Sequence, residues 1–160
     1  MIPETVAYYH AMLMVGIRDK LDEAFDRALE TEEPLSELVL SLSTCISDDE
    51  AVLSVLRNYL AEHTIDKKIV YHMIRGDFRQ RCLTEQLPRA EVAELLYRIV
   101  MSLDKFSEDP WHQLTFPMYA LEVRQEGLIS EEVFNRCFDA WLFQGERLDV
   151  WQLQRDQTKK

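Results

Sequence analysis

Apolar residues recur at spacings of three and four along almost the whole of this 160-residue chain, and that spacing is typical of amphipathic helices. Residues that form tight turns are scarce, because the chain has only 4 glycines and 5 prolines. Hairpins between strands depend on such turn residues, so this composition offers little with which to build a sheet. We therefore predict an all-α protein.

The breaks in the apolar pattern predict where the helices begin and end. Pro34 fits the first turn of a helix, where a missing backbone N–H costs nothing. Ser47 with Glu50 three residues later has the form of a capping box, and Ser130 fits the N-cap of a later helix. Pro117 falls inside an apolar pattern and predicts a kink or a restart there. These signals divide the chain into about seven helices.

Short connections between helices predict antiparallel neighbours, either as one compact antiparallel bundle or as a short stack of helical hairpins. A chain of this length with 47% hydrophobic residues suits one core. We therefore predict a single all-helical domain over residues 1–145. We predict that residues 146–160 form a C-terminal extension, partly docked through Trp151 and disordered at its end.

Negative charge is concentrated in one part of the sequence. The formal net charge is −11, and the segment from Asp19 to Glu50 holds eleven carboxylates against two basic residues, Lys20 and Arg27. That segment therefore carries −9 in one fifth of the chain. At 100° per residue, five of its carboxylates fall within an arc of roughly 100° on one helix. They are Asp19, Asp22, Glu23, Asp26 and Glu30.

This acidic stripe is either a solvated helix face or a docking face for a basic protein. Each pair of like charges three or four residues apart lowers the stability of a helix by a few tenths of a kcal/mol. A helix can be soluble without such pairs. We therefore predict a protein-binding module that docks, and neutralises or regulates, a basic partner, a profile shared by toxin-immunity proteins and antitoxins. The predicted partner-binding residues are Asp19, Asp22, Glu23, Asp26, Glu30, Glu33, Glu37 and Trp151.

The sign of the charge reverses between Asp66 and Arg89, a segment with six basic and three acidic residues and a net charge of +3. Two interpretations stay within the molecule: these residues face the acidic helices, or they lie beside a sheltered carboxylate. A nucleic-acid partner is not expected, because a protein of net charge −11 repels a polyanion at long range.

One short motif points to an alternative function. Arg57 and Asn58 are followed, after four residues, by His63. This arrangement resembles the Arg-Asn-x4-His motif of HEPN ribonucleases, which are small all-helical proteins. The resemblance spans seven residues and implies metal-independent RNA cleavage by a dimer, in which Arg57 would hold the phosphate and His63 would act in acid-base catalysis.

Other signatures of chemistry are absent from the sequence, which contains no serine nucleophile elbow, no P-loop, no dinucleotide fingerprint and no zinc-protease motif. We therefore predict a protein that is not an enzyme and that needs no metal or cofactor. Cys45, Cys82 and Cys137 are widely spaced and predict reduced, packed thiols. No stretch approaches the roughly 18 uninterrupted apolar residues of a membrane span, so we predict a cytoplasmic protein with no membrane partner. A self-assembling scaffold protein is the remaining alternative.

Overall fold

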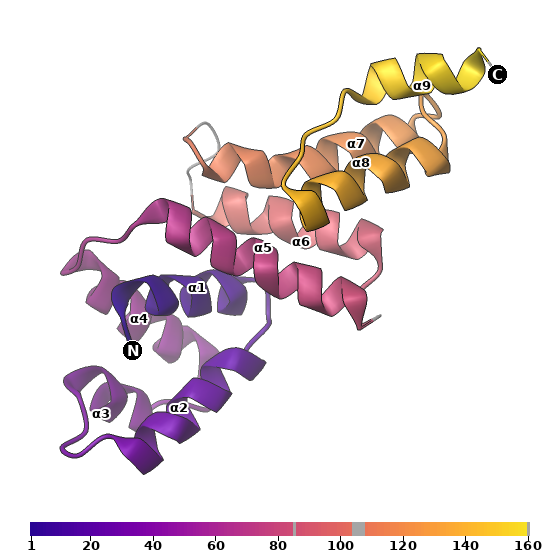
Figure 1. Cartoon of the computed structure of the whole chain (residues 1–160). Helices are drawn as coiled ribbons and strands as arrows, with labels where there is room; N and C mark the ends of the chain where they lie inside the picture. Colours follow the sequence, from indigo (N-terminus) through magenta and orange to yellow (C-terminus); the bar gives the residue numbers. More distant parts are fainter. Residues whose placement is uncertain (85, 104–107, 160) are drawn as a thin grey trace. The chain divides into compact units, whose positions relative to one another are not determined.

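A computed structural model describes residues 1–84, 86–103 and 108–159 of the chain (Figure 1). Over these residues all regular secondary structure is helical, which confirms the predicted all-α class. The chain divides into two compact units, Met1–Ile74 and Arg75–Lys160, and the division falls within helix α5 (Lys67–Leu83). We call them unit 1 and unit 2 and describe each by itself.

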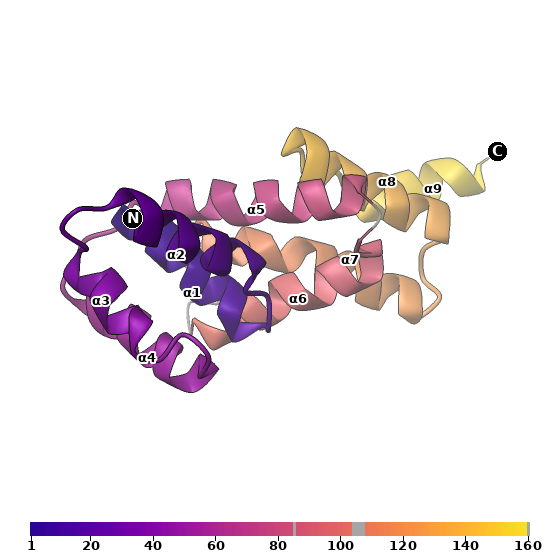
Figure 2. The same ribbon diagram turned by 90° about the horizontal axis from the view of Figure 1, so that it is seen from below.

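Unit 1 is built from α1 (Pro3–Met14), α2 (Asp19–Thr31), α3 (Glu37–Ser43), α4 (Asp49–Ala61) and the first part of α5. Helix α4 packs against α1 and α3, and α3 also packs against α2 (Figures 1 and 2). One apolar cluster joins all four helices. Its members include Val6, Leu13, Leu21, Phe25, Leu38, Leu42, Val52 and Leu56.

Unit 2 contains the end of α5, α6 (Arg89–Ser102), the 3₁₀ helix η1 (Trp111–Thr115), α7 (Phe116–Gln125), α8 (Glu131–Gln144) and α9 (Val150–Thr158). Helix α7 packs against both α6 and α8, and α9 packs against α8 (Figures 1 and 2). The interior is filled by large apolar side chains with no measurable exposure, among them Leu96, Ile99, Leu121, Phe134 and Phe138.

Two of the predicted helix boundaries are confirmed. The chain restarts at Phe116 after a 3₁₀ turn, with Pro117 in the first turn of α7. Ser130 is the N-cap of α8, because its Oγ accepts a hydrogen bond from the Val133 N–H at 3.2 Å.

Two other boundary predictions are wrong, because in both cases the N-cap is a residue one or two positions later. Helix α3 does not begin at Pro34, since Ser36 is its N-cap and accepts from the Val39 N–H at 3.3 Å. The N-cap of α4 is Asp48 rather than Ser47, and one Asp48 oxygen accepts from the N–H groups of Glu50 and Ala51. A carboxylate is also favoured by the helix dipole at this position.

The predicted number of about seven helices is too low, because the described residues form nine α-helices. One of them, α9, lies in the segment that we predicted as an extension. Asp149 caps α9, and the Oε1 atoms of Gln154 and Gln157 accept hydrogen bonds from the backbone N–H and the hydroxyl of Ser130 at 2.9 and 2.6 Å. The predicted disordered end includes Lys160, which lies outside the described residues.

Removing the Asp48 cap tests the corrected start of α4. We expect Asp48→Ala to lower the free energy of unfolding by about 1 kcal/mol, because two N–H groups of the first turn lose their acceptor. Ser47→Ala is the matched control and should change stability by less than about 0.5 kcal/mol. Urea unfolding followed by circular dichroism measures both values. Equal losses in the two variants would contradict the assignment of Asp48 as the cap.

Candidate protein-binding surface

The carboxylates of α2 lie on the side of the helix opposite its buried residues. Leu21, Phe25 and Ala28 are buried in the core of unit 1. Residues two positions away along a helix point to a different side, so burial of these three turns the acidic positions outward. Four carboxylates of α2 are exposed, and we call them the acidic face: Asp19, Glu23, Asp26 and Glu30.

Asp22, the fifth member of the predicted stripe, is only half-exposed because Arg18 binds it. The Arg18 guanidinium donates to Asp22 through Nε at 3.0 Å and through Nη2 at 2.8 Å. Its Nη1 also pairs with Asp49 at the start of α4, and its Nη2 donates to the carbonyl oxygen of Ile46 at 2.6 Å. Arg18 thus links the start of α2 to the loop before α4.

The hydrogen bond to Asp22 raises the pKa of Arg18, against the opposing effect of burial, and the charge of Asp49 adds to the increase. Arg18 was not among the predicted site residues, because it lies one position before the acidic segment that begins at Asp19. The i,i+4 spacing of Arg18 and Asp22 is a signal that was available. Asp49, at 31 residues from Arg18, gave no such signal.

Asp19 Oδ1 accepts a hydrogen bond from the backbone N–H of Lys20 at 3.0 Å. The remaining carboxylates at predicted partner-binding positions have a weak partner or none within the described part of the chain. Lys20 pairs with Glu23 at 3.4 Å, and both side chains are more than half exposed, so this ion pair is weak. Asp26, Glu30, Glu33 and Glu37 are exposed, and within the described part of the chain no hydrogen bond or ion pair reaches their carboxylates. These four carboxylates are therefore exposed and unpaired within the described residues.

The negative charge is distributed unequally between the two units. Unit 1 contains fourteen carboxylates and six basic side chains, a net charge of −8. Unit 2 contains fifteen carboxylates and twelve basic side chains, a net charge of −3. Most of the −11 of the whole chain therefore belongs to the unit that carries the acidic face.

Several arginines of the basic stretch are engaged with residues of unit 2. Arg81 pairs with Asp77 on the next turn of α5, and these side chains are only 12% and 5% exposed. Arg89 donates to both carboxylate oxygens of Asp139 at 2.8 and 2.9 Å. The interpretation of a basic residue beside a sheltered carboxylate is thus confirmed for Arg81. Glu85, which entered the predicted net charge of the stretch, lies outside the described residues.

Trp151 is the one predicted partner-binding residue that belongs to unit 2. It lies in the first turn of α9, and its side chain is 38% exposed. The indole Nε1 donates to the Tyr119 hydroxyl of α7 at 2.8 Å. The seven predicted carboxylates all lie in unit 1, so Trp151 belongs to a different unit from them.

Of the two residues of the ribonuclease resemblance, Arg57 lies in the C-terminal half of α4 and His63 follows the C-cap of that helix. Arg57 and His63 are both exposed. The His63 ring stacks on the Tyr59 ring with centroids 3.9 Å apart, and its Nδ1 lies 2.7 Å from the carbonyl oxygen of Tyr59. Arg57 acts electrostatically on His10 of α1. The catalytic role of the pair stays a prediction.

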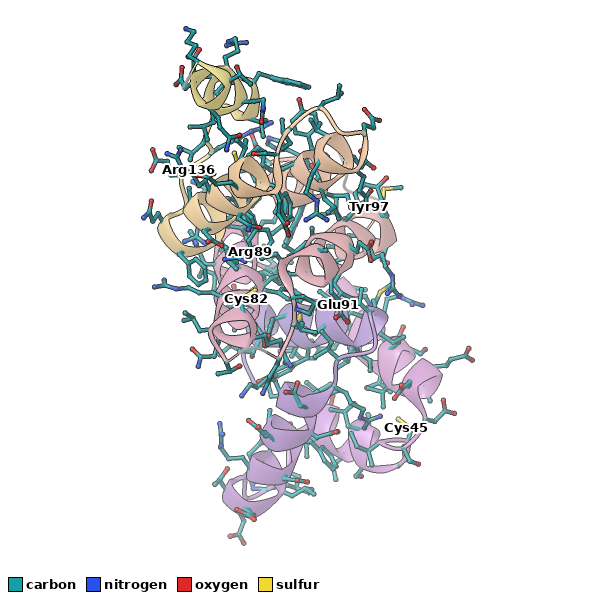
Figure 3. All side chains as sticks on the ribbon, turned by 90° about the vertical axis from the view of Figure 1, so that its right-hand side faces the viewer. Cys45, Cys82, Arg89, Glu91, Tyr97 and Arg136 are labelled. Carbon is teal, nitrogen blue, oxygen red and sulfur yellow. The ribbon has the colours of Figure 1, made fainter. Side chains whose placement is uncertain are left out.

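The three cysteines are free thiols, and burial changes the pKa of two of them. Burial raises the pKa of Cys137 to about 11 and also raises that of Cys82. Cys82 lines a hollow of about 390 Å³ in unit 2 together with Arg89 and Asp139. Figure 3 shows Cys82 and Arg89 close to each other. A thiol with a raised pKa is a poor nucleophile at neutral pH, so burial makes Cys82 less reactive than an ordinary free thiol.

No protein-family model, curated protein or solved structure matches this chain. Among the described residues, no group of three or more histidine, cysteine, aspartate or glutamate side chains is placed to hold a metal ion. None of the helices in this part of the chain is both long enough and apolar enough to cross a membrane.

Replacing Arg18 tests whether its contacts hold the acidic segment in place. We expect Arg18→Met to lower the free energy of unfolding by about 1–3 kcal/mol, because the carboxylates of Asp22 and Asp49 lose charge-assisted hydrogen bonds. Lys20→Met removes the same charge from an exposed ion pair and should cost less than about 0.5 kcal/mol. Thermal unfolding measures both. A loss in Arg18→Met no larger than the control would show that these contacts do not stabilise unit 1.

His10 is the buried polar side chain of α1, 8% exposed, and its Nε2 has no hydrogen-bond partner among the described residues. Burial lowers the pKa of His10 from its ordinary value of 6.5, and the positive charge of Arg57 lowers it further. At a pH below that ordinary pKa, His10 is protonated in the unfolded chain and stays neutral in the folded chain until the pH falls further. The contribution of His10 to stability is therefore present above the unfolded pKa and is lost as the pH falls toward the folded one.

We expect His10→Phe to lose less stability than the parent chain between about pH 7.5 and about pH 5, since the variant has no imidazole to protonate at this position. Urea unfolding at both pH values gives the comparison. Titration of the His10 ring by NMR provides a direct control. An equal loss of stability in the two chains would mean that the folded state protonates His10 freely.

Proposed function

We propose that this chain is an acidic protein-binding module that docks a basic protein partner and thereby neutralises or regulates it, as immunity proteins and antitoxins do. The observation that carries the proposal is the acidic face of α2. Its Asp26 and Glu30 carboxylates are exposed and have no partner in the described part of the chain.

The energetics of α2 support a role beyond solubility. Asp19 with Glu23, Glu23 with Asp26 and Asp26 with Glu30 are like-charge pairs at helical spacings of three or four. Each pair destabilises the helix by a few tenths of a kcal/mol. A mixture of lysine and glutamate would keep the helix soluble without that cost. A basic partner relieves the repulsion when it binds.

The charge of unit 1 suits electrostatic steering. A net −8 on one unit produces a directional field that raises the association rate of a cationic protein and falls off over about 8 Å at physiological salt. Apolar contacts supply most of the affinity in such complexes. Leu29 on α2 and Leu40 on α3 are 43% and 51% exposed and offer contact area of this kind.

Charge reversal on α2 tests the proposal. We expect the immobilised chain to retain a basic protein from native lysate at low salt, and we expect the variant Glu23→Lys, Asp26→Lys, Glu30→Lys to lose it. Asp22 is kept because it holds Arg18. Bound proteins are identified by mass spectrometry, and the affinity of the purified partner is then measured by calorimetry.

A matched control changes the net charge equally at exposed positions of unit 2, through Glu94→Lys, Glu126→Lys and Glu146→Lys. The proposal requires this control to keep the partner. Loss in both variants would indicate a general charge effect without a docking face, and retention by the α2 variant would refute the proposal.

A further inference from the structure

A groove lies between α3 and α4 in unit 1, with a volume of about 190 Å³. Helix α3 contributes Glu37 and Leu38, and α4 contributes Val55, Asn58 and Tyr59. Glu62, the C-cap of α4, also lines the groove. Positions 55, 58, 59 and 62 have the spacing of one helix face, so one side of the C-terminal half of α4 borders the groove.

The groove combines an apolar floor with an acidic rim. Leu38 is buried and Val55 is half-buried, so their side chains form a surface from which water is partly excluded. Glu37 and Glu62 are exposed, and no hydrogen bond or ion pair reaches their carboxylates in the part of the chain that the structure describes. A ligand that fits must therefore have an apolar stem and a cationic end.

Tyr59 adds a third element of recognition. Its ring is half-buried in the groove and packs against the His63 ring with an interplanar angle of 17°. The His63 Nδ1 also lies 2.7 Å from the backbone carbonyl oxygen of Tyr59. An aromatic ring offers a surface for a planar cation, and Asn58 beside it carries an amide oxygen that can accept a hydrogen bond.

We propose that this groove binds an arginine side chain of the partner protein, with its methylene groups over Leu38 and Val55 and its guanidinium paired with Glu37 and Glu62. Arginine suits the site better than lysine because its planar group stacks on aromatic rings and presents five donors to carboxylates. The inference rests on the proposed function, since Glu37 also belongs to the acidic segment that would face the partner. It adds the contact that would anchor the partner.

A defined probe tests the groove without the partner. We expect N-acetyl-argininamide to shift the NMR signals of the Asn58 side-chain amide and of Tyr59 in the full chain, with saturation. The citrulline analogue has nearly the same shape and no charge, so it should produce no saturable shift there. N-acetyl-lysinamide should bind at least about tenfold more weakly. Equal binding of the lysine or citrulline probe would overturn the arginine assignment, as would the absence of any shift at the groove.

Two double variants separate this inference from the proposed function. Glu37→Gln with Glu62→Gln should weaken binding of the arginine probe by about tenfold or more, because two charge-assisted hydrogen bonds are lost. Glu23→Gln with Glu30→Gln removes the same charge from α2 and should leave probe binding nearly unchanged. Equal weakening by the two variants would refute a specific groove. Probe binding that persists when no basic protein is captured would leave the groove intact and refute only the proposed function.

A second copy of the chain is the competing occupant. Sedimentation of the parent chain and of the Glu37→Gln, Glu62→Gln variant distinguishes the two. We expect both to sediment alike. A dimer in the parent chain that the variant loses would assign the groove to self-association and overturn the proposal.

Discussion

The burial of Leu21, Phe25 and Ala28 in the core of unit 1 decides which way α2 faces, and the candidate surface depends on it. Side chains on a helix turn as a fixed set, so anchoring these three leaves the acidic face no orientation but outward. The same core includes Leu38 of α3 and Leu56 of α4, whose packing brings these two helices together. The groove with the acidic rim is a consequence of that contact.

Arg18 forms ion pairs with some carboxylates of the acidic segment and leaves others without a partner of this kind among the described residues. It binds Asp22 and Asp49, and the partial shelter of its side chain, 29% exposed, makes these contacts stronger than those of a fully solvated pair. Asp26, Glu30 and Glu37 are left exposed. The number of acidic residues in the sequence thus overstates the acid that is exposed and unpaired, because Arg18 binds Asp22 and Asp49.

The two proposals assign different physical roles to one unit. A net charge of −8 acts at long range and selects cationic partners before contact, whereas the groove acts only once side chains touch. Long-range charge alone does not discriminate well among basic proteins. A groove that fits one amphipathic cation beside the Tyr59 ring would add that discrimination at the point of contact.

The sequence alone determined what depends on local periodicity: the all-α class, the restart at Pro117, the Ser130 cap and the outward side of α2. It could not choose between adjacent acceptors such as Ser47 and Asp48, because the winner depends on the path of the chain into α4. Only the tertiary structure decided the pairing of Arg18 with Asp49, that of Arg89 with Asp139, and the groove between α3 and α4. These features join residues that are distant in sequence. Apolar packing between helices brings such residues together, and the spacing of residues within one helix does not indicate which ones will meet.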